Sequence, residues 1–238
     1  ALGALVITSG KQSVERELPP GKDGLFYTAY LLCLAGLLGV TITGDAFNIF
    51  VFLEISSLSS YVLISLGRQP MALTAAYRYL VLGTIGATFY LIGVGLLYQA
   101  TGTLNIADLA TRVAELTESR SVRAAFAFMT VGIGIKLALF PLHIWLPNAY
   151  AYAPSVSSAF LAATATKVSI YVLIRVFYTI FGPAFSFETL PLDWVLLPLA
   201  IIAMFVGSTI AIFQVDIKRM LAYSSCLLYT SDAADDLY

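Results

Sequence analysis

Two basic side chains flank a proline within an otherwise apolar stretch of the sequence. Lys136 lies in a run that is apolar enough for lipid, and His143 follows seven residues later, with Pro141 between them. Seven residues are close to two helical turns, so the spacing predicts that both groups project from one helix face. Pro141 has no N–H to donate and its ring clashes with the preceding turn, so a regular helix should break there. A charged amine in hydrocarbon costs at least about 2.5 kcal/mol, which favours a proton-handling site at a broken membrane helix.

Two further ionisable residues in apolar stretches extend this candidate site. Glu54 lies in an apolar run that leads into several serines, and Lys167 has threonine and serine residues beside it. A carboxylate and two amines on three helices could pass protons from one to the next. Glu54 near Lys136 would keep the amine charged, and loss of that partner would favour release of the proton. The predicted proton pathway therefore comprises Glu54, Lys136, His143 and Lys167, with Pro141 as the structural helix break.

Each of these residues also has a purely structural interpretation. Glu54 and Lys136 could form a static ion pair that only holds the helices together, and His143 could satisfy a polar group at the helix break. Arg175, about two turns beyond Lys167, could extend toward the membrane interface instead of joining the pathway. Because intramembrane charges usually mark transport pathways, the functional interpretation is preferred for Glu54, Lys136 and Lys167 and stays open for His143.

Composition places these residues in a membrane. The sequence is 59% hydrophobic and only 11% charged, whereas a soluble domain has about 45–50% apolar and 25% charged residues. We therefore expect an all-α integral membrane protein, a polytopic helical bundle with a discontinuous helix at Lys136–Pro141. Runs of about 20 apolar residues can span a bilayer. The predicted spans are 25–43, 46–66, 76–100, 122–141, 156–181 and 194–213, with a partial helix at 1–9 and another helix starting near 220.

Composition also argues against several classes of function. A net charge of −1 and the lack of a basic, aromatic-interleaved patch argue against nucleic acid as a partner. Two isolated cysteines, Cys33 and Cys226, predict neither a disulfide framework nor a zinc site. The sequence contains no Gly-rich phosphate loop and no CxxC or HExxH motif. We therefore expect no cofactor and no metal in this chain.

The segments between the spans carry the polar residues. Residues 10–24 hold Pro19-Pro20-Gly21 and mixed charges, which predicts a solvated connection, whereas 104–120 has the pattern of a short amphipathic connecting helix. Lysine and arginine in short loops favour the cytoplasmic side of a membrane. One predicted side holds seven such residues and should be cytoplasmic: Lys11, Arg16, Lys22, Arg68, Arg78, Lys218 and Arg219. The opposite side holds three: Arg112, Arg120 and Arg123.

Four motifs resemble the antiporter-like subunit family that respiratory complex I shares with Mrp-type multisubunit sodium/proton antiporters. They are Phe52–Tyr61, Lys136–Pro147, Ala162–Lys167 and Asp216–Ser225, and they occur in order over most of the chain. The resemblance implies a fourteen-helix subunit, of which residues 1–225 would be a partial proton-translocating domain of about helices four to nine. Residues 226–238 resemble translated sequencing-adapter read-through, so we expect this tail to be non-native.

The resemblance also assigns individual residues. It matches Glu54 to the glutamate of the family's helix five, Lys136 to the lysine of its discontinuous helix seven, and Lys167 to the lysine of helix eight. Complex I members usually carry an aspartate and a histidine where this sequence has Asn148 and Tyr150. This departure favours the D-type subunit of the Mrp antiporters.

The resemblance implies a proton-translocating subunit of a multisubunit monovalent cation/proton antiporter in the inner or plasma membrane. Protons and either Na⁺ or K⁺ would be the transported ions, and other integral membrane subunits would be the partners. One alternative is a membrane-arm subunit of NADH–quinone oxidoreductase or a related hydrogenase, in which partner subunits would carry out electron transfer. A second alternative is a non-conducting scaffold.

Overall fold

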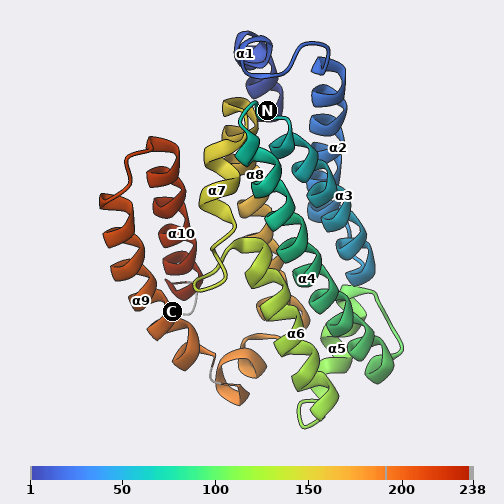
Figure 1. Ribbon diagram of the computed structural model, residues 1–238. Coiled ribbons are helices and arrows are strands. Elements are labelled where there is room, and N and C mark those ends of the chain that lie inside the picture. The colour runs from blue at the N-terminus through green and yellow to red at the C-terminus, as the bar shows by residue number, and fades with distance from the viewer. Residues whose placement is uncertain (1, 191, 236–238) are drawn as a thin grey trace.

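The computed structural model describes residues 2–190 and 192–235, and these residues form a bundle of helices (Figure 1). The α-helices are α1 (Leu2–Glu17), α2 (Asp23–Ile42), α3 (Ala46–Ser65), α4 (Pro70–Thr101), α5 (Ile106–Glu115), α6 (Arg120–Leu137), α7 (Leu146–Tyr152), α8 (Ser155–Ile174), α9 (Asp193–Ile212) and α10 (Ile217–Asp235). Two π-helical segments, η1 (Arg175–Ile180) and η2 (Ala184–Thr189), follow α8. Extended pairing within the described ranges is limited to a single bridge between Asp45 and Asn105.

Five helical stretches are long and apolar enough to cross a membrane: α2, α3, α4, α8 together with η1, and α9. They confirm the predicted fold class, an all-α integral membrane protein. Helix α6 is not among them, because its 18 residues include Arg120, Arg123 and Lys136. Five of the six predicted complete spans therefore have the length and apolar composition of a membrane helix, and α6 carries too many charges.

Helices α4 and α6 approach each other until their backbones touch. A Cβ atom added to Gly132 would lie 2.5 Å from the carbonyl oxygen of Gly86, and one added to Gly93 would lie 2.9 Å from that of Ala125. Small residues permit such close approach of two helices in a membrane. Close packing matters there because lipid tails are as apolar as the side chains, so the hydrophobic effect does not drive the helices together. This close packing fixes the position of α6, which carries Lys136.

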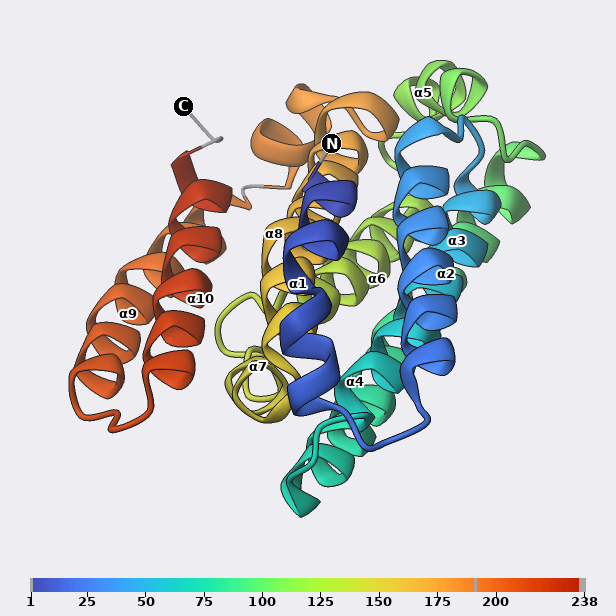
Figure 2. The same ribbon diagram turned by 90° about the horizontal axis from the view of Figure 1, so that it is seen from above.

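Several boundaries differ from the sequence-based prediction. Helix α1 extends to Glu17, into the region predicted as a solvated connection over 10–24. The apolar side chains of Val14 and Leu18 are buried, so this charged segment forms a helix that packs on α8 (Figure 2). Helix α4 begins at Pro70 instead of residue 76, and the sequence analysis missed the short helices α7 and η2.

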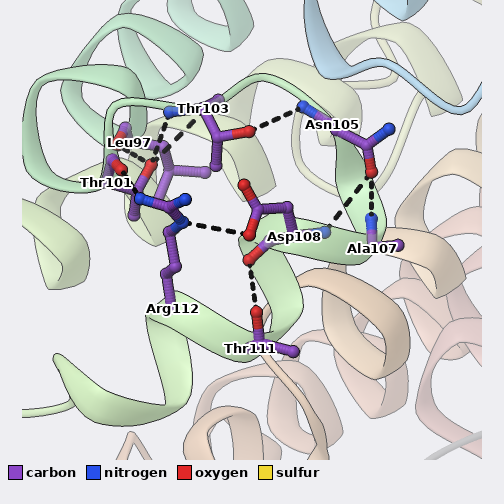
Figure 3. Close-up of polar contacts among 8 residues, drawn as sticks. All are labelled: Leu97, Thr101, Thr103, Asn105, Ala107, Asp108, Thr111 and Arg112. Atoms are coloured by element: carbon purple, nitrogen blue, oxygen red, sulfur yellow. Dashed lines mark hydrogen bonds and ion pairs between the residues drawn. The ribbon is translucent and has the colours of Figure 1, made fainter.

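Helix α5 is the amphipathic connecting helix that the sequence predicted, and a polar network fixes it to the end of α4 (Figure 3). The side chain of Asn105 accepts hydrogen bonds from two backbone N–H groups of the first turn. Arg112 lies 3.0 Å from Asp108 and donates to the carbonyl oxygen of Thr101, the last residue of α4. These bonds satisfy backbone groups that helix ends leave unpaired. Hydrogen bonds from Arg112 and Thr103 also hold the pKa of Asp108 below its ordinary value.

Buried apolar side chains form two clusters that meet at residues 137–139. One cluster contains Leu137 and Leu139 together with side chains of α5 and η1, and the other contains Ala138 and Trp145 together with side chains of α1, α2 and α8. Helices α9 and α10 form a hairpin beside the bundle, and α10 packs on α7 (Figures 1 and 2). The chain after α6 therefore crosses between the two apolar clusters.

Candidate functional site

Helix α6 ends at Leu137, which confirms the predicted discontinuous helix. Ala138 adopts a left-handed conformation with φ of 61°, the N–H of Ala138 bonds to the carbonyl of Ile135, and the N–H of Leu139 bonds to that of Gly134. These two bonds are the pattern of a Schellman C-cap, in which the left-handed position usually holds glycine. A helix continued to Pro141 would leave the carbonyl of Leu137 without a donor, so the break precedes the proline by one turn.

Trp145 closes this break. Its indole Nε1 donates to the carbonyl oxygen of Ile135 at 3.0 Å, which adds a second hydrogen bond to a backbone carbonyl in the last turn of α6. Its ring stacks on Tyr79 of α4, with ring centroids 3.9 Å apart and an interplanar angle of 5°. The two contacts hold the segment after the break against both α4 and α6.

The side chain of Lys136 points into the bundle and is only 4% exposed. Its Nζ atom lies 3.2 Å from Oε1 of Glu54 and 2.5 Å from Oγ of Ser57. Because the Ser57 hydroxyl donates its hydrogen to the carbonyl of Leu53 at 2.7 Å, its oxygen accepts from the amine. Glu54 and Ser57 are three residues apart and share one face of α3. The structure thus brings Glu54 and Lys136 together as the sequence predicted.

A small cavity of about 20 Å³ lies beside Lys136, between α3, α6 and α8. Its walls include the hydroxyl side chains of Ser56 and Ser60 on α3 and of Thr166 and Ser169 on α8. A cavity that holds one water molecule needs about 10–15 Å³ and two to four polar partners. The cavity therefore has room and hydrogen-bonding groups for about one water molecule between the amine and α8.

The structure does not bring His143 to this cavity. The predicted common helix face of Lys136 and His143 was wrong, because α6 ends before His143 and the intervening residues form turns. The His143 ring stacks on Phe140 at 5.2 Å, and its Nδ1 atom is buried without a regular hydrogen bond to the described residues. The spacing argument failed because it carried helical periodicity through the break.

Lys167 and Arg175 lie outside the cavity as well. Lys167 is exposed on the surface of this chain and donates to the carbonyl of Ala162 at 2.6 Å, although the neighbouring residue Thr166 lines the cavity. Arg175 donates to the carbonyl of Thr43 at 2.7 Å, just after the end of α2. A cation at a helix C-terminus interacts favourably with the helix dipole, so Arg175 ties η1 to α2.

Sequence reasoning did not single out several polar and aromatic residues around Lys136, among them Ser57, Trp145, Thr166 and Ser169. Ser57 had a detectable signal, because a residue three positions after Glu54 on a helix shares its face. The other three depend on how α8 and the segment after the break pack against α6, and no local pattern contains that information.

A comparison with protein families gives a match over residues 43–227 to the family described as NADH:quinone oxidoreductase/Mrp antiporter, TM. This chain belongs to that family. The matched region contains the Glu54–Lys136 pair, the broken helix and every residue that lines the cavity except Leu37. The family assignment therefore agrees with the resemblance inferred from the four sequence motifs.

Relatives in the NADH:quinone oxidoreductase/Mrp antiporter family include both kinds of subunit. The chain is 50% identical over 209 residues to the N-type subunit of the NADH-quinone oxidoreductase of Desulforudis audaxviator, covering 87% of this chain and 40% of that protein. It is 39% identical over 200 residues to the D-type subunit of the Na(+)/H(+) antiporter of Alkalihalophilus pseudofirmus, covering 83% of this chain and 39% of that protein. The chain thus spans about 40% of the length of these relatives.

One solved structure contains a chain with the same fold. In the Mrp complex from Dietzia, one chain superimposes with a TM-score of 0.77 at 30% identity, covering 87% of this chain and 38% of that chain. The fold of this chain is therefore shared with one chain of the Mrp complex, and its relatives include both oxidoreductase and antiporter subunits.

Proposed function

We propose that this chain is a proton-translocating part of a D-type subunit of a monovalent cation/proton antiporter. The proposal is carried by the enclosed amine of Lys136, which contacts the carboxylate of Glu54 and the hydroxyl of Ser57. Ionisable side chains inside a membrane are costly and usually mark ion pathways. The similarity to the D-type subunit of a Na(+)/H(+) antiporter supports the same function.

The proposed route begins at Glu54, whose side chain is 23% exposed and so reaches the surface of this chain. Lys136 releases a proton to a water molecule in the adjoining cavity and regains one through Glu54. Thr166 lies on the far wall of the cavity, and Lys167 beside it is the next proposed acceptor after rotation of its side chain. His143 is proposed as a relay beside the helix break. In this scheme the Glu54–Lys136 contact is a switch, because loss of the carboxylate's charge favours proton release from the amine.

The proposal extends to ions, partners and location. The transported ions are H⁺ and either Na⁺ or K⁺, and no cofactor is assigned to the chain. Other integral membrane subunits are the proposed partners, which is supported by the likeness to one chain of the Mrp complex. The proposed location is the cell membrane, with the side that holds the seven basic residues facing the cytoplasm.

A second candidate function is that of a membrane-arm subunit of NADH–quinone oxidoreductase. It is favoured by the 50% identity to an N-type subunit of such an enzyme. The same Glu54–Lys136 pair would then move protons that are driven by electron transfer in partner subunits. The two functions share the proton site and differ in the source of energy.

Reconstitution of the full-length protein with its co-purified partners tests the proposal. The complex is placed in liposomes that contain a pH-sensitive dye, and a Na⁺ or K⁺ gradient is applied without NADH or quinone. The antiporter predicts a pH change that depends on the cation gradient and is lost in the Lys136→Met variant. A pH change that requires NADH and quinone, with none in response to a cation gradient, would instead establish the oxidoreductase function. Equal flux in wild type, Glu54→Gln, Lys136→Met and Lys167→Met would leave the scaffold as the remaining function.

A further inference from the structure

A cavity of about 100 Å³ lies between the first half of α4, helix α7 and the start of α10. Its charged and polar lining consists of Arg78 on α4, Asn148 and Tyr152 on α7, and Arg219 on α10, together with Thr74. No carboxylate of the described residues lines it. Neither arginine takes part in any of the three salt bridges found within the described ranges. Two arginines therefore line one cavity without a counter-ion from this part of the chain.

Arg219 is held in place but is not fully satisfied. Its guanidinium lies over the ring of Tyr152, 5.1 Å from the centroid, and Nη2 donates to the Tyr152 hydroxyl. Its Nε atom is buried and has no hydrogen-bond partner among the described residues. Buried donors are almost always paired, so this N–H calls for an acceptor from outside the described chain. An oxyanion in the cavity would supply both the acceptor and the missing negative charge.

A neighbouring basic cavity of about 200 Å³ provides an internal comparison, because Tyr152 lines both cavities. Arg16, Arg68 and Lys218 line this second cavity, and Arg68 and Lys218 already donate to backbone carbonyl groups. Glu17 also lines it and supplies a carboxylate. The second cavity therefore has its charges partly compensated, whereas the Arg78–Arg219 cavity does not.

The surroundings of the Arg78–Arg219 cavity are those of a membrane surface. Both arginines belong to the group of seven basic residues on the predicted cytoplasmic side. Exposed apolar side chains stand close to each arginine in the sequence, with Met71 and Leu73 on α4 and Met220 and Leu221 on α10. A ligand that fits has a phosphate group for the two guanidinium groups and acyl chains for this apolar surface. Arginine pairs with phosphate oxygens through two parallel hydrogen bonds.

We propose that Arg78 and Arg219 bind the phosphate group of an anionic phospholipid. The lipid links α4 to α10 across α7, the helix that follows the broken α6. Anionic lipids of the cytoplasmic leaflet attract basic residues near the membrane surface, and basic pockets between membrane helices bind such headgroups. The site is separate from the Glu54–Lys136 pair and does not depend on the proposed antiport.

The test measures which lipids stay with the protein. The full-length protein with its partner subunits is reconstituted in nanodiscs of phosphatidylcholine and phosphatidylglycerol, and native mass spectrometry identifies the lipids retained after release into detergent. Wild type is expected to retain phosphatidylglycerol in preference to phosphatidylcholine, and the double variant Arg78→Gln/Arg219→Gln is expected to lose this preference. Equal retention of phosphatidylglycerol by wild type and double variant would overturn the proposal.

Two controls keep the result interpretable. Lys11→Gln/Lys22→Gln removes the same charge from the same side at exposed positions outside both cavities, and it should retain the preference. A loss of preference in this variant as well would show a general charge effect and overturn the site. Because Arg219 also anchors α10 on Tyr152, Arg78→Gln alone is included as a variant that leaves that contact intact.

A further experiment distinguishes binding of a phospholipid from binding of free phosphate. Thermal stability of the delipidated protein in detergent is measured with phosphatidylglycerol or with inorganic phosphate. The proposal predicts that the lipid stabilises wild type more than it stabilises the Arg78→Gln variant. Inorganic phosphate should give no comparable stabilisation. Equal stabilisation by inorganic phosphate would assign the cavity to a free anion and overturn the phospholipid.

Discussion

The amine of Lys136 lies 3.2 Å from the carboxylate of Glu54, across the interface of α3 and α6. The two partners are buried unequally, since the lysine side chain is 4% exposed and the glutamate side chain 23%. A buried ion pair is weak evidence for stability, because the loss of hydration offsets much of the attraction between the charges. We therefore propose that the pair serves proton transfer more than it stabilises the fold.

Neutralising both partners of this pair should cost less stability than the two single changes added together. Lys136→Met or Glu54→Gln alone leaves a buried polar or charged group without its partner, and the expected loss is up to about 3–5 kcal/mol. The double variant removes the charge of both groups, so its loss should be smaller than the sum of the two single losses. Thermal unfolding in detergent checks this cycle. Additive losses would show that the two side chains do not interact in the folded protein.

Ser57 should tune proton uptake by Lys136. Its hydroxyl donates to Leu53 and accepts from the amine, so Ser57→Ala removes a hydrogen bond to a charged group, worth about 1.5–3 kcal/mol. The protonated amine is stabilised less in the variant, so the pH of half-maximal proton flux should move toward acid by about one to two units. Ser59→Ala is the matched control, because Ser59 is buried on the same helix and bonds to Ile55. Identical pH profiles for wild type and Ser57→Ala would remove Ser57 from the site.

Close packing of α4 on α6 should tolerate no added methyl group. A Cβ atom at Gly132 would lie 2.5 Å from the carbonyl oxygen of Gly86, so Gly132→Ala forces the helices apart and should destabilise the protein by about 1–3 kcal/mol. Gly95→Ala is the control, since Gly95 is on α4 and has nothing within 4 Å of the added atom. Its effect should be neutral or stabilising, because alanine favours helix more than glycine does. Equal melting temperatures for the two variants would contradict the observed helix contact.

The carboxylate of Glu17 should make stability depend on pH. It accepts hydrogen bonds from the N–H of Ser155, at the start of α8, at 2.6 Å and from the hydroxyl of Ser13 at 2.7 Å. Burial raises the pKa of Glu17, but these hydrogen bonds outweigh burial and hold the pKa below its ordinary value. A lowered folded pKa gives stability above the unfolded pKa, and this contribution is lost as pH falls through the folded pKa.

Glu17→Gln is therefore expected to lower the free energy of unfolding at neutral pH by about 0.5–2 kcal/mol, the range for loss of a helix cap. The variant should also lose less stability than wild type on acidification below about pH 4.3. Glu15→Gln is the control, because Glu15 is an exposed residue of the same helix. Thermal melts across pH check the difference, and parallel curves for wild type and Glu17→Gln would show that the carboxylate does not cap α8.

The sequence predicted the long helices well and the short or charged ones poorly. Apolar runs place α2, α3 and α9 within two residues of their observed bounds, because bilayer thickness fixes the length of a span. Helix α1 was underestimated, since its charged second half packs on the bundle through the buried side chain of Val14, and Leu18, just beyond its end, is buried as well. Helix α7 was missed because it is seven residues long and contains Pro147.

The same contrast holds within the site. Charges inside apolar runs were enough to predict that Glu54 and Lys136 meet, because each needs a partner in a dry environment. The predicted position of His143 was wrong, because the helix ends at Leu137 and the periodicity behind the prediction ends with it. Thr166 and Ser169 line the cavity because of the way α8 packs on α3 and α6. No local pattern in a single sequence predicts that packing.

Proton flux through the Lys136→Met variant is the most direct test of the account. The full-length protein and its partners are reconstituted in liposomes, and flux is measured with a pH-sensitive dye after co-purification has shown that the complex assembles. Loss of a group that exchanges protons typically reduces a rate by about 10²–10⁴-fold, so flux should fall by about 100-fold or more while assembly is unchanged. Wild-type flux in an assembled Lys136→Met complex would contradict the role of this amine.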